Sequence, residues 1–270
     1  MPTNPSCSQD STWRAVRAAN IIDLATVLFV NIDDHLPRQS HSQEKLEFSE
    51  LVTIGVMFAF KGGSFKRFYT WLVANFATCF PTLPERSRLQ RRLITQKECV
   101  KSFLAKPSFF CIADSYGIEL RHPIREFHKP KTTRVGSKGK SNKRWIHGMK
   151  VLVLINDQDE VVDLKLELVS PADKIFNSVL EKYDNQTIVL TDQGFRDKNG
   201  VPACVKMCAH KTWSERMCVE RLFSRLTRFF GAKKRCHRSQ AGLEAWWSFL
   251  VVGLNVVAKL NEYSLGDFIF

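Results

Sequence analysis

The sequence predicts an α/β protein in which a mixed β-sheet is flanked by helices and preceded by an all-helical N-terminal domain. In residues 13–80, apolar side chains recur at intervals of three and four, which is the period of an amphipathic helix. Residues 145–156 and 161–170 alternate apolar and polar side chains around NDQDE, as in a β-hairpin. Helical and strand patterns then follow one another, as in a sheet covered by helices.

The N-terminal region carries helical patterns and no alternating segment. We expect its helices at residues 13–32, 48–62, 64–80 and 85–106. The last follows Pro84 and stops before Pro107. Its arginines share one face, which fits either a DNA-contacting helix or a solvated one. We therefore divide the chain into a helical domain, residues 1–106, and a second domain, residues 107–270.

The second domain opens with a short apolar run that ends at Asp114. Residues 121–144 are basic and contain glycine and serine, so we expect an extended loop. After the hairpin we expect a helix at residues 171–183, strands at 187–192 and 204–211, and a long helix at about 214–230. The apolar segment 245–260, about 16 residues long, is too short to cross a bilayer comfortably and is predicted to be a buried helix.

The chain is strongly basic, with 40 Lys and Arg against 27 Asp and Glu. This excess favours a polyanionic partner, either nucleic acid or an acidic membrane surface, and a merely solvated basic surface is the alternative. A membrane partner ranks last, because no basic amphipathic helix with an exposed apolar face is present. The N-terminus lacks a secretory pattern, so we expect a cytoplasmic protein with reduced cysteines. Cys204, Cys208 and His210 suggest zinc, but no second pair completes a tetrahedral set, and reduced core thiols are the default interpretation.

Two aspartates are placed where strands end. Asp192 directly follows the strand pattern TIVLT, and Asp114 closes the earlier apolar run; active-site groups of α/β proteins collect at such positions. Glu220 lies in the long helix, four residues after Arg216 and seven after Trp213, so the three share one face. Glu220 and Arg216 could simply form an ion pair.

A divalent metal is the other explanation of these acids. Three carboxylates brought together repel one another, and Mg²⁺ removes that repulsion because it prefers hard oxygen ligands. Two such ions support in-line displacement at phosphorus. The residues alone leave metal binding and ion pairing both open.

The segments ADS at Asp114, LTDQGF at Asp192 and WSERMCVERLFSRLTRFFG at Glu220 resemble the acid-triad (DDE) transposases of bacterial insertion sequences. The resemblance is greatest to small members of the group that includes the transposase of transposon five, and it covers about residues 107–260. The helix signature of that family matches at Trp213, Arg216 and Glu220, but Thr227 stands where the family has lysine. Arg225 or Arg228 would then supply the cation from a neighbouring position.

The resemblance implies a ribonuclease H-like catalytic core that hydrolyses phosphodiesters at the element ends and joins the freed 3′ hydroxyls to target DNA. It implies that Asp114, Asp192 and Glu220 are catalytic and bind Mg²⁺ or Mn²⁺. Arg216 would orient Glu220 or hold a phosphate, and Trp213 would stack on a flipped base or belong to the core. Lys150 would clamp the scissile backbone, with a solvated strand end as the more common alternative. The other expected DNA contacts are Lys138, Lys140, Lys143, Arg144, Arg225 and Arg228.

By analogy with the family, the partner is double-stranded DNA, both terminal inverted repeats and target, and two ends would be held by a homodimer. The N-terminal helices would recognise the repeats. Two alternatives stay open: a nuclease on the same fold that cuts without joining, and a transposase-derived DNA-binding protein that is catalytically inactive.

Overall fold

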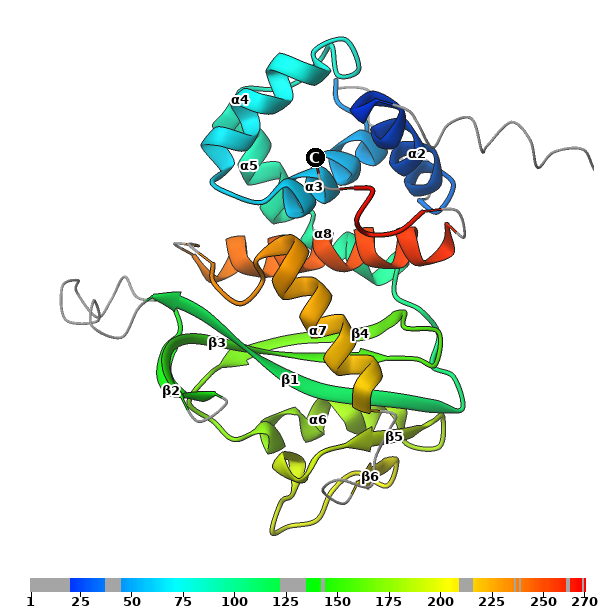
Figure 1. Cartoon of the computed structure of the whole chain (residues 1–270), viewed down its shortest axis with the longest axis vertical. Coiled ribbons are helices and arrows are strands. Elements are labelled where there is room, and N and C mark those ends of the chain that lie inside the picture. The colour runs from blue at the N-terminus through cyan, green and yellow to red at the C-terminus, as the bar shows by residue number, and fades with distance from the viewer. Residues whose placement is uncertain are drawn as a thin grey trace, which may run out of the picture.

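The computed structural model describes residues 20–36, 45–121, 135–141, 144–208, 216–235, 237, 239–260, 263–268 and 270 (Figure 1). Within them, a mixed sheet is covered by helices and joined to a helical N-terminal region, as the sequence predicts. Helix α7 crosses one face of the sheet, and α8 lies between the sheet and the N-terminal helices (Figure 1).

The sheet has six strands in the order β2-β3-β1-β5-β6, with β4 also pairing with β3. β3 is antiparallel to β1, β2 and β4, whereas β5 is parallel to both β1 and β6. The predicted hairpin is therefore confirmed. The strands are β1 (Phe110–Arg121), β2 (Ser137–Ser141), β3 (Arg144–Ile155), β4 (Val161–Leu168), β5 (Ile188–Thr191) and β6 (Val205–Met207).

The helices follow the expected order along the chain. Those of the N-terminal region are α2 (Ile21–Asp33), α3 (Phe48–Lys61), α4 (Phe65–Phe76), α5 (Arg86–Thr95) and the 3₁₀ helix η1 (Lys97–Ser102). Short helical turns between strands are η4 (Asp173–Phe176), α6 (Asn177–Leu180), η5 (Glu181–Tyr183) and η6 (Gln193–Phe195). The two long helices near the C-terminus are α7 (Arg216–Phe230) and α8 (Gln240–Lys259).

Two hydrophobic clusters cover opposite faces of the sheet, because successive side chains of a strand point to opposite sides. On β1, Ile112 and Tyr116 belong to the cluster that also contains α7, α8 and the N-terminal helices. Cys111 and Ala113 belong to the second cluster, which η4 and α6 close. The side chains of β1 at even positions thus face α7, and those at odd positions face η4.

Helix α8 is buried nearly all round, and this explains its uniformly apolar sequence. It approaches α3 closely at two glycines: a Cβ on Gly55 would lie 2.5 Å from the ring of Phe249, and one on Gly253 would lie 2.5 Å from that of Phe60. Each ring therefore occupies the space that the opposite glycine leaves. Among the described helices, α8 alone has the length and apolarity to span a membrane, but 78% of that window is buried inside the protein.

Three expectations need correction. Asp114 does not end a strand, because β1 continues pairing with β3 as far as Arg121. The basic segment 121–144 is not all loop, since residues 137–141 form β2 against β3; residues 122–134 lie outside the described part. The buried apolar helix is longer than the 16-residue segment, because residues 240–244, which include Gln240 and Glu244, extend it. The boundary at residue 106 stays a prediction, although the N-terminal helices and the sheet share one buried cluster.

Asn255 on α8 joins two segments from inside the core. It is 2% exposed, its Oδ1 accepts from the Val161 amide at 2.8 Å, and its Nδ2 donates to the Phe103 carbonyl at 2.8 Å. Replacing it with leucine keeps the volume but leaves both backbone groups without this partner. We expect Asn255→Leu to lower the free energy of unfolding by about 2–4 kcal/mol in urea titrations. Asn75→Leu, on the exposed side of α4, is the matched control and should change it by less than about 1 kcal/mol.

Candidate functional site

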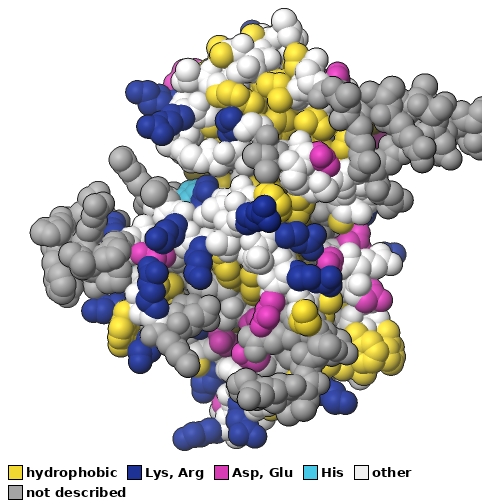
Figure 2. Space-filling view, viewed as in Figure 1, with side chains coloured by type: hydrophobic (Ala, Val, Ile, Leu, Met, Phe, Trp, Pro, Cys, Tyr) yellow, Lys and Arg dark blue, Asp and Glu magenta, His cyan; other side chains and the backbone are white. Residues whose placement is uncertain are grey.

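A pocket of about 810 Å³ is lined by residues of the sheet, of α7 and of η4, and all three predicted acids line it. Asp114 comes from β1, Asp192 follows β5, and Glu220 lies on α7, so three distant segments of the chain meet there. Figure 2 shows acidic side chains gathered at the centre of this face, with Lys and Arg side chains around them. The structure therefore brings together the residues that the sequence analysis singled out.

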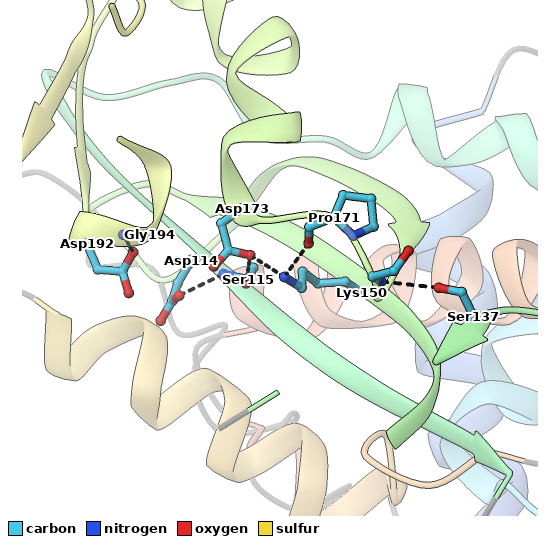
Figure 3. A network of polar contacts seen from close by, with 9 residues as sticks. Asp114, Ser115, Ser137, Lys150, Pro171, Asp173, Asp192 and Gly194 are labelled. Atoms are coloured by element: carbon cyan, nitrogen blue, oxygen red, sulfur yellow. Dashed lines mark hydrogen bonds and ion pairs between the residues drawn. The ribbon is translucent and has the colours of Figure 1, made fainter. Parts of the chain in front are cut away.

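The two aspartates are held by their local backbone. Asp114 lies at an even position of β1, so its side chain faces α7, and its Oδ1 accepts from the Ser115 amide at 2.7 Å. Asp192 is the N-cap of η6, where its Oδ1 accepts from the Gly194 amide at 2.8 Å. Both carboxyl groups point towards α7 (Figure 3). The predicted position of Asp192 at the end of a buried strand is confirmed.

Glu220 reaches the pocket because one stripe of α7 faces β1. Phe223, Ser224 and Thr227 line the pocket with it, at the i+3, i+4 and i+7 spacing of a single helix face. Thr227 bonds the hydroxyl of Tyr116 on β1, and the rings of Tyr116 and Phe223 lie 4.7 Å apart. These contacts fix the rotation of α7 and thereby point Glu220 towards the pocket.

Six cations also line the pocket: Lys140, Arg144, Lys150, Arg228, Lys233 and Lys234. Two of them pair with further acids of the pocket, Arg144 with Glu119 and Lys150 with Asp173. Lys150 is 7% exposed, so the alternative of a solvated strand end is wrong. It is buried because it lies in the middle of β3, between β1 and β4.

Of the remaining predicted DNA contacts, some line the pocket and others lie elsewhere. Arg228 lines the pocket, whereas Arg225 pairs with Asp159 in the turn between β3 and β4, at 3.1 Å. Lys138 lies on β2, over the ring of Trp145 at 5.7 Å. Arg216 begins α7, but its side chain, like Trp213 and Lys143, lies outside the described part of the structure.

The structure allows the choice between a zinc ligand and a reduced core thiol to be examined at Cys204. His210, another proposed zinc ligand, is outside the described residues. The thiol donates to the Leu180 carbonyl at 3.3 Å. Burial, together with the nearby Asp184, raises the pKa of Cys204 to about 12. A thiol that stays protonated is a poor metal ligand, so Cys204 fits the reduced core cysteine that the sequence favoured.

Sequence reasoning missed several residues of this site. Asp173 contacts Lys150, and its only signal was its place in the segment SPAD, residues 170–173, directly after the hairpin. Lys233 and Lys234 reach the pocket because their segment pairs with β1, where the Glu119 amide donates to the Lys233 carbonyl at 2.8 Å. Their signal was the KKR tract after α7. Trp145, 53% exposed between Lys138 and Lys140, had no signal beyond its basic surroundings.

The chemistry of the acids fits a hard divalent cation. Their donors are carboxylate oxygens, which Mg²⁺ and Mn²⁺ prefer. In the described part of the chain, no three His, Cys, Asp or Glu side chains already form a ligand cluster. Mg²⁺ is usually held by one or two carboxylates, with waters and substrate phosphates completing the shell, so its chemistry does not require a third acidic ligand beside Asp114 and Asp192.

Comparison with known proteins does not assign the chain. No family model matches it, and no curated protein has a significantly similar sequence. The likeness to insertion-sequence transposases therefore stays a prediction that depends on the motifs.

The contact between Tyr116 and α7 gives a prediction about alkaline stability. Burial raises the pKa of Tyr116 above its ordinary value, and the hydrogen bond with Thr227 partly offsets the rise. The folded chain thus keeps this proton at pH values where the unfolded chain has lost it, so the free energy of unfolding falls as pH rises past 10. Tyr116→Phe should lose about 1 kcal/mol at pH 7 and show a shallower fall above pH 10 in urea titrations. An unchanged alkaline slope would contradict the burial of this phenol.

Proposed function

We propose that this protein is a DNA transposase with a ribonuclease H-like core. It would hydrolyse phosphodiesters at the ends of an insertion sequence and join the 3′ ends to target DNA. The observation that carries the proposal is the single pocket lined by Asp114, Asp192 and Glu220 and surrounded by lysines and arginines.

The order of the acids along the fold supports the proposal. Asp114 lies on the first strand of the sheet, Asp192 in the turn after a later parallel strand, and Glu220 on a helix that crosses the same face. These are the placements that the resemblance implies for a transposase triad. The mixed sheet, with antiparallel β1, β3 and β4 followed by parallel β5 and β6, agrees with a ribonuclease H-like core.

Asp114, Asp192 and Glu220 would hold the metal. When bound, Mg²⁺ or Mn²⁺ supplies charge neutralisation and activates water or a 3′ hydroxyl for attack at phosphorus. The chain itself contributes the fixed directions of the two aspartates, through the Ser115 and Gly194 amides, and the rotation of α7 that presents Glu220. These contacts limit how far the acids must move to meet a ligand.

The cations would bind the DNA backbone. Lys233, Lys234 and Arg228 lie on the α7 side of the pocket, and Lys140 and Arg144 lie on the hairpin of β2 and β3. Both groups meet at Glu119, which pairs with Arg144 and whose amide donates to the Lys233 carbonyl, so a DNA backbone held there would extend along β1 towards Asp114. The exposed ring of Trp145, between two lysines, is a surface on which an unpaired base can stack.

The other parts of the proposal concern partners. Two element ends must be held together for joining, which requires two active sites, so we propose a homodimer on DNA. The N-terminal helices would bind the terminal inverted repeats, and α5 presents exposed Arg88 and Arg91 for such a contact. The cytoplasm is the proposed compartment.

Charge removal at the acids tests the proposed chemistry. We expect Asp114→Asn, Asp192→Asn and Glu220→Gln each to reduce Mg²⁺-dependent cleavage by at least about 100-fold, because the metal loses a ligand. The substrate is DNA that carries the repeats flanking the gene, and cleavage and strand transfer are read on sequencing gels. Asp159→Asn, which removes a half-buried acid outside the pocket, should keep nearly full activity.

The same assay separates the alternatives. A nuclease cuts this DNA but does not join pre-cut ends to a target. An inactive DNA-binding protein binds the repeats without cutting in either Mg²⁺ or Mn²⁺, and its acid variants bind equally well. A Glu220→Gln variant that cuts at the wild-type rate would refute the role given to this glutamate.

Salt dependence tests the DNA surface. Binding to phosphates releases counterions, so the logarithm of affinity falls linearly with that of salt concentration. We expect the pair Lys233→Gln and Lys234→Gln to lower the magnitude of this slope by about 2, measured by fluorescence anisotropy with duplex DNA. Lys182→Gln, an exposed lysine on η5 outside the pocket, should leave the slope unchanged. If the Lys233 and Lys234 pair variant and the Lys182→Gln variant had the same slope of affinity against salt, the DNA would bind to another surface of the protein.

A further inference from the structure

Asp173, a fourth carboxylate of the pocket, contacts the segments that carry both catalytic aspartates. Its Oδ1 accepts from the Ser115 hydroxyl at 2.6 Å and from Lys150 Nζ at 2.8 Å (Figure 3). It starts η4, on the face of the sheet opposite α7. The side chain is 23% exposed, so these contacts are largely shielded from water.

The contact with Ser115 fixes β1 immediately next to Asp114. Neighbouring side chains of a strand point to opposite faces, so Ser115 projects towards η4 while Asp114 projects towards α7. A hydrogen bond that holds Ser115 from behind therefore sets the direction of Asp114 in front. The amide of Ser115 also donates to Asp114 Oδ1, so a single residue joins the two acids.

The second contact is with the turn that carries Asp192. A Cβ placed on Gly194 would lie 2.8 Å from Asp173 Oδ2 and 2.9 Å from Asp192 Oδ1. Glycine is therefore required here by close approach, because any side chain would displace one carboxylate or the other. Since the Gly194 amide donates to Asp192, the position of Asp173 limits that of Asp192 as well.

Lys150 makes this arrangement stable. Its ammonium group lies 2.8 Å from Asp173 Oδ1 and offsets the charge of this partly buried carboxylate beside two other acids. Lys150 Nζ also donates to the Pro171 carbonyl at 3.1 Å, and its partner across the sheet is Gly117, which has no side chain to fill the space. The lysine is thus held by the Pro171 carbonyl and by Asp173, in the space that Gly117 leaves open.

We propose that Asp173, neutralised by Lys150, is a positioning residue that holds Asp114 and Asp192 at the separation a divalent ion requires. This inference rests on the proposed function, because it assigns Asp173 a role in the same metal site. Asp173 acts through Ser115 and Gly194 and is not itself a ligand.

The experiment measures Mn²⁺ affinity by electron paramagnetic resonance, in the whole chain and without DNA. We expect Asp173→Asn to weaken Mn²⁺ binding by about 10- to 100-fold, as is usual when a group that orients ligands is changed. Gly194→Ala should weaken it similarly, because the added methyl displaces a carboxylate while the fold is kept. Cleavage by both variants should recover at raised Mn²⁺ concentration, which a damaged fold would not allow. Asp197→Asn is the control: this acid pairs with Lys174 of the same η4 turn, at 3.4 Å, and should bind Mn²⁺ as the wild type does.

A double variant distinguishes the positioning effect of Asp173 from the effect of the Lys150 charge on metal binding. Asp173→Asn leaves the Lys150 ammonium without its carboxylate, and that charge alone would repel a metal ion. Combining it with Lys150→Met removes the charge, so affinity should stay low if positioning matters and return if only charge matters. Restored affinity, or wild-type affinity in Asp173→Asn, overturns the inference and leaves the proposed function intact. A wild-type chain that binds no Mn²⁺ overturns both.

Discussion

Strand β1 is the constraint on which the rest of the structure depends. It is the only described strand that pairs with β3 on one side and β5 on the other, so it joins the antiparallel and parallel parts of the sheet. Because successive side chains of β1 point to opposite faces of the sheet, Asp114 lies on the α7 face and Ser115 on the η4 face. Tyr116, one residue later, holds α7 through Thr227. Three consecutive residues thus connect the sheet to both layers around it.

The charge distribution follows from this arrangement. A chain with a net charge of +13 gathers several acids in one pocket, and it does so by pairing some of them internally. Glu119 forms an ion pair with Arg144, and Asp173 forms one with Lys150. The paired acids sit beside the proposed ligands without adding their full charge to the repulsion. A basic protein can therefore keep a local anionic site within a surface whose charge favours a polyanion.

The sequence predicted the mixed sheet, its hairpin and the helices, because strand alternation and helix period are local, and its motifs pointed to three acids that line one pocket. It did not predict where β1 ends, since pairing with β3 carries the strand through polar residues that look like a loop. Lys150 looked exposed because a lysine in an alternating strand usually is, and only the position of η4 shows its partner. Asp173 was overlooked for the same reason: its contacts lie 58 and 23 residues away in the chain.

The departure at Thr227 has a structural explanation. A lysine there would lose the hydroxyl that bonds Tyr116, and with it a contact that sets the rotation of α7. Arg228 is the next residue along the helix, and it lines the same pocket. Arg225 does not, because it pairs with Asp159. Between the two arginines that could replace the missing lysine, the packing of α7 therefore favours Arg228, while position 227 anchors the helix.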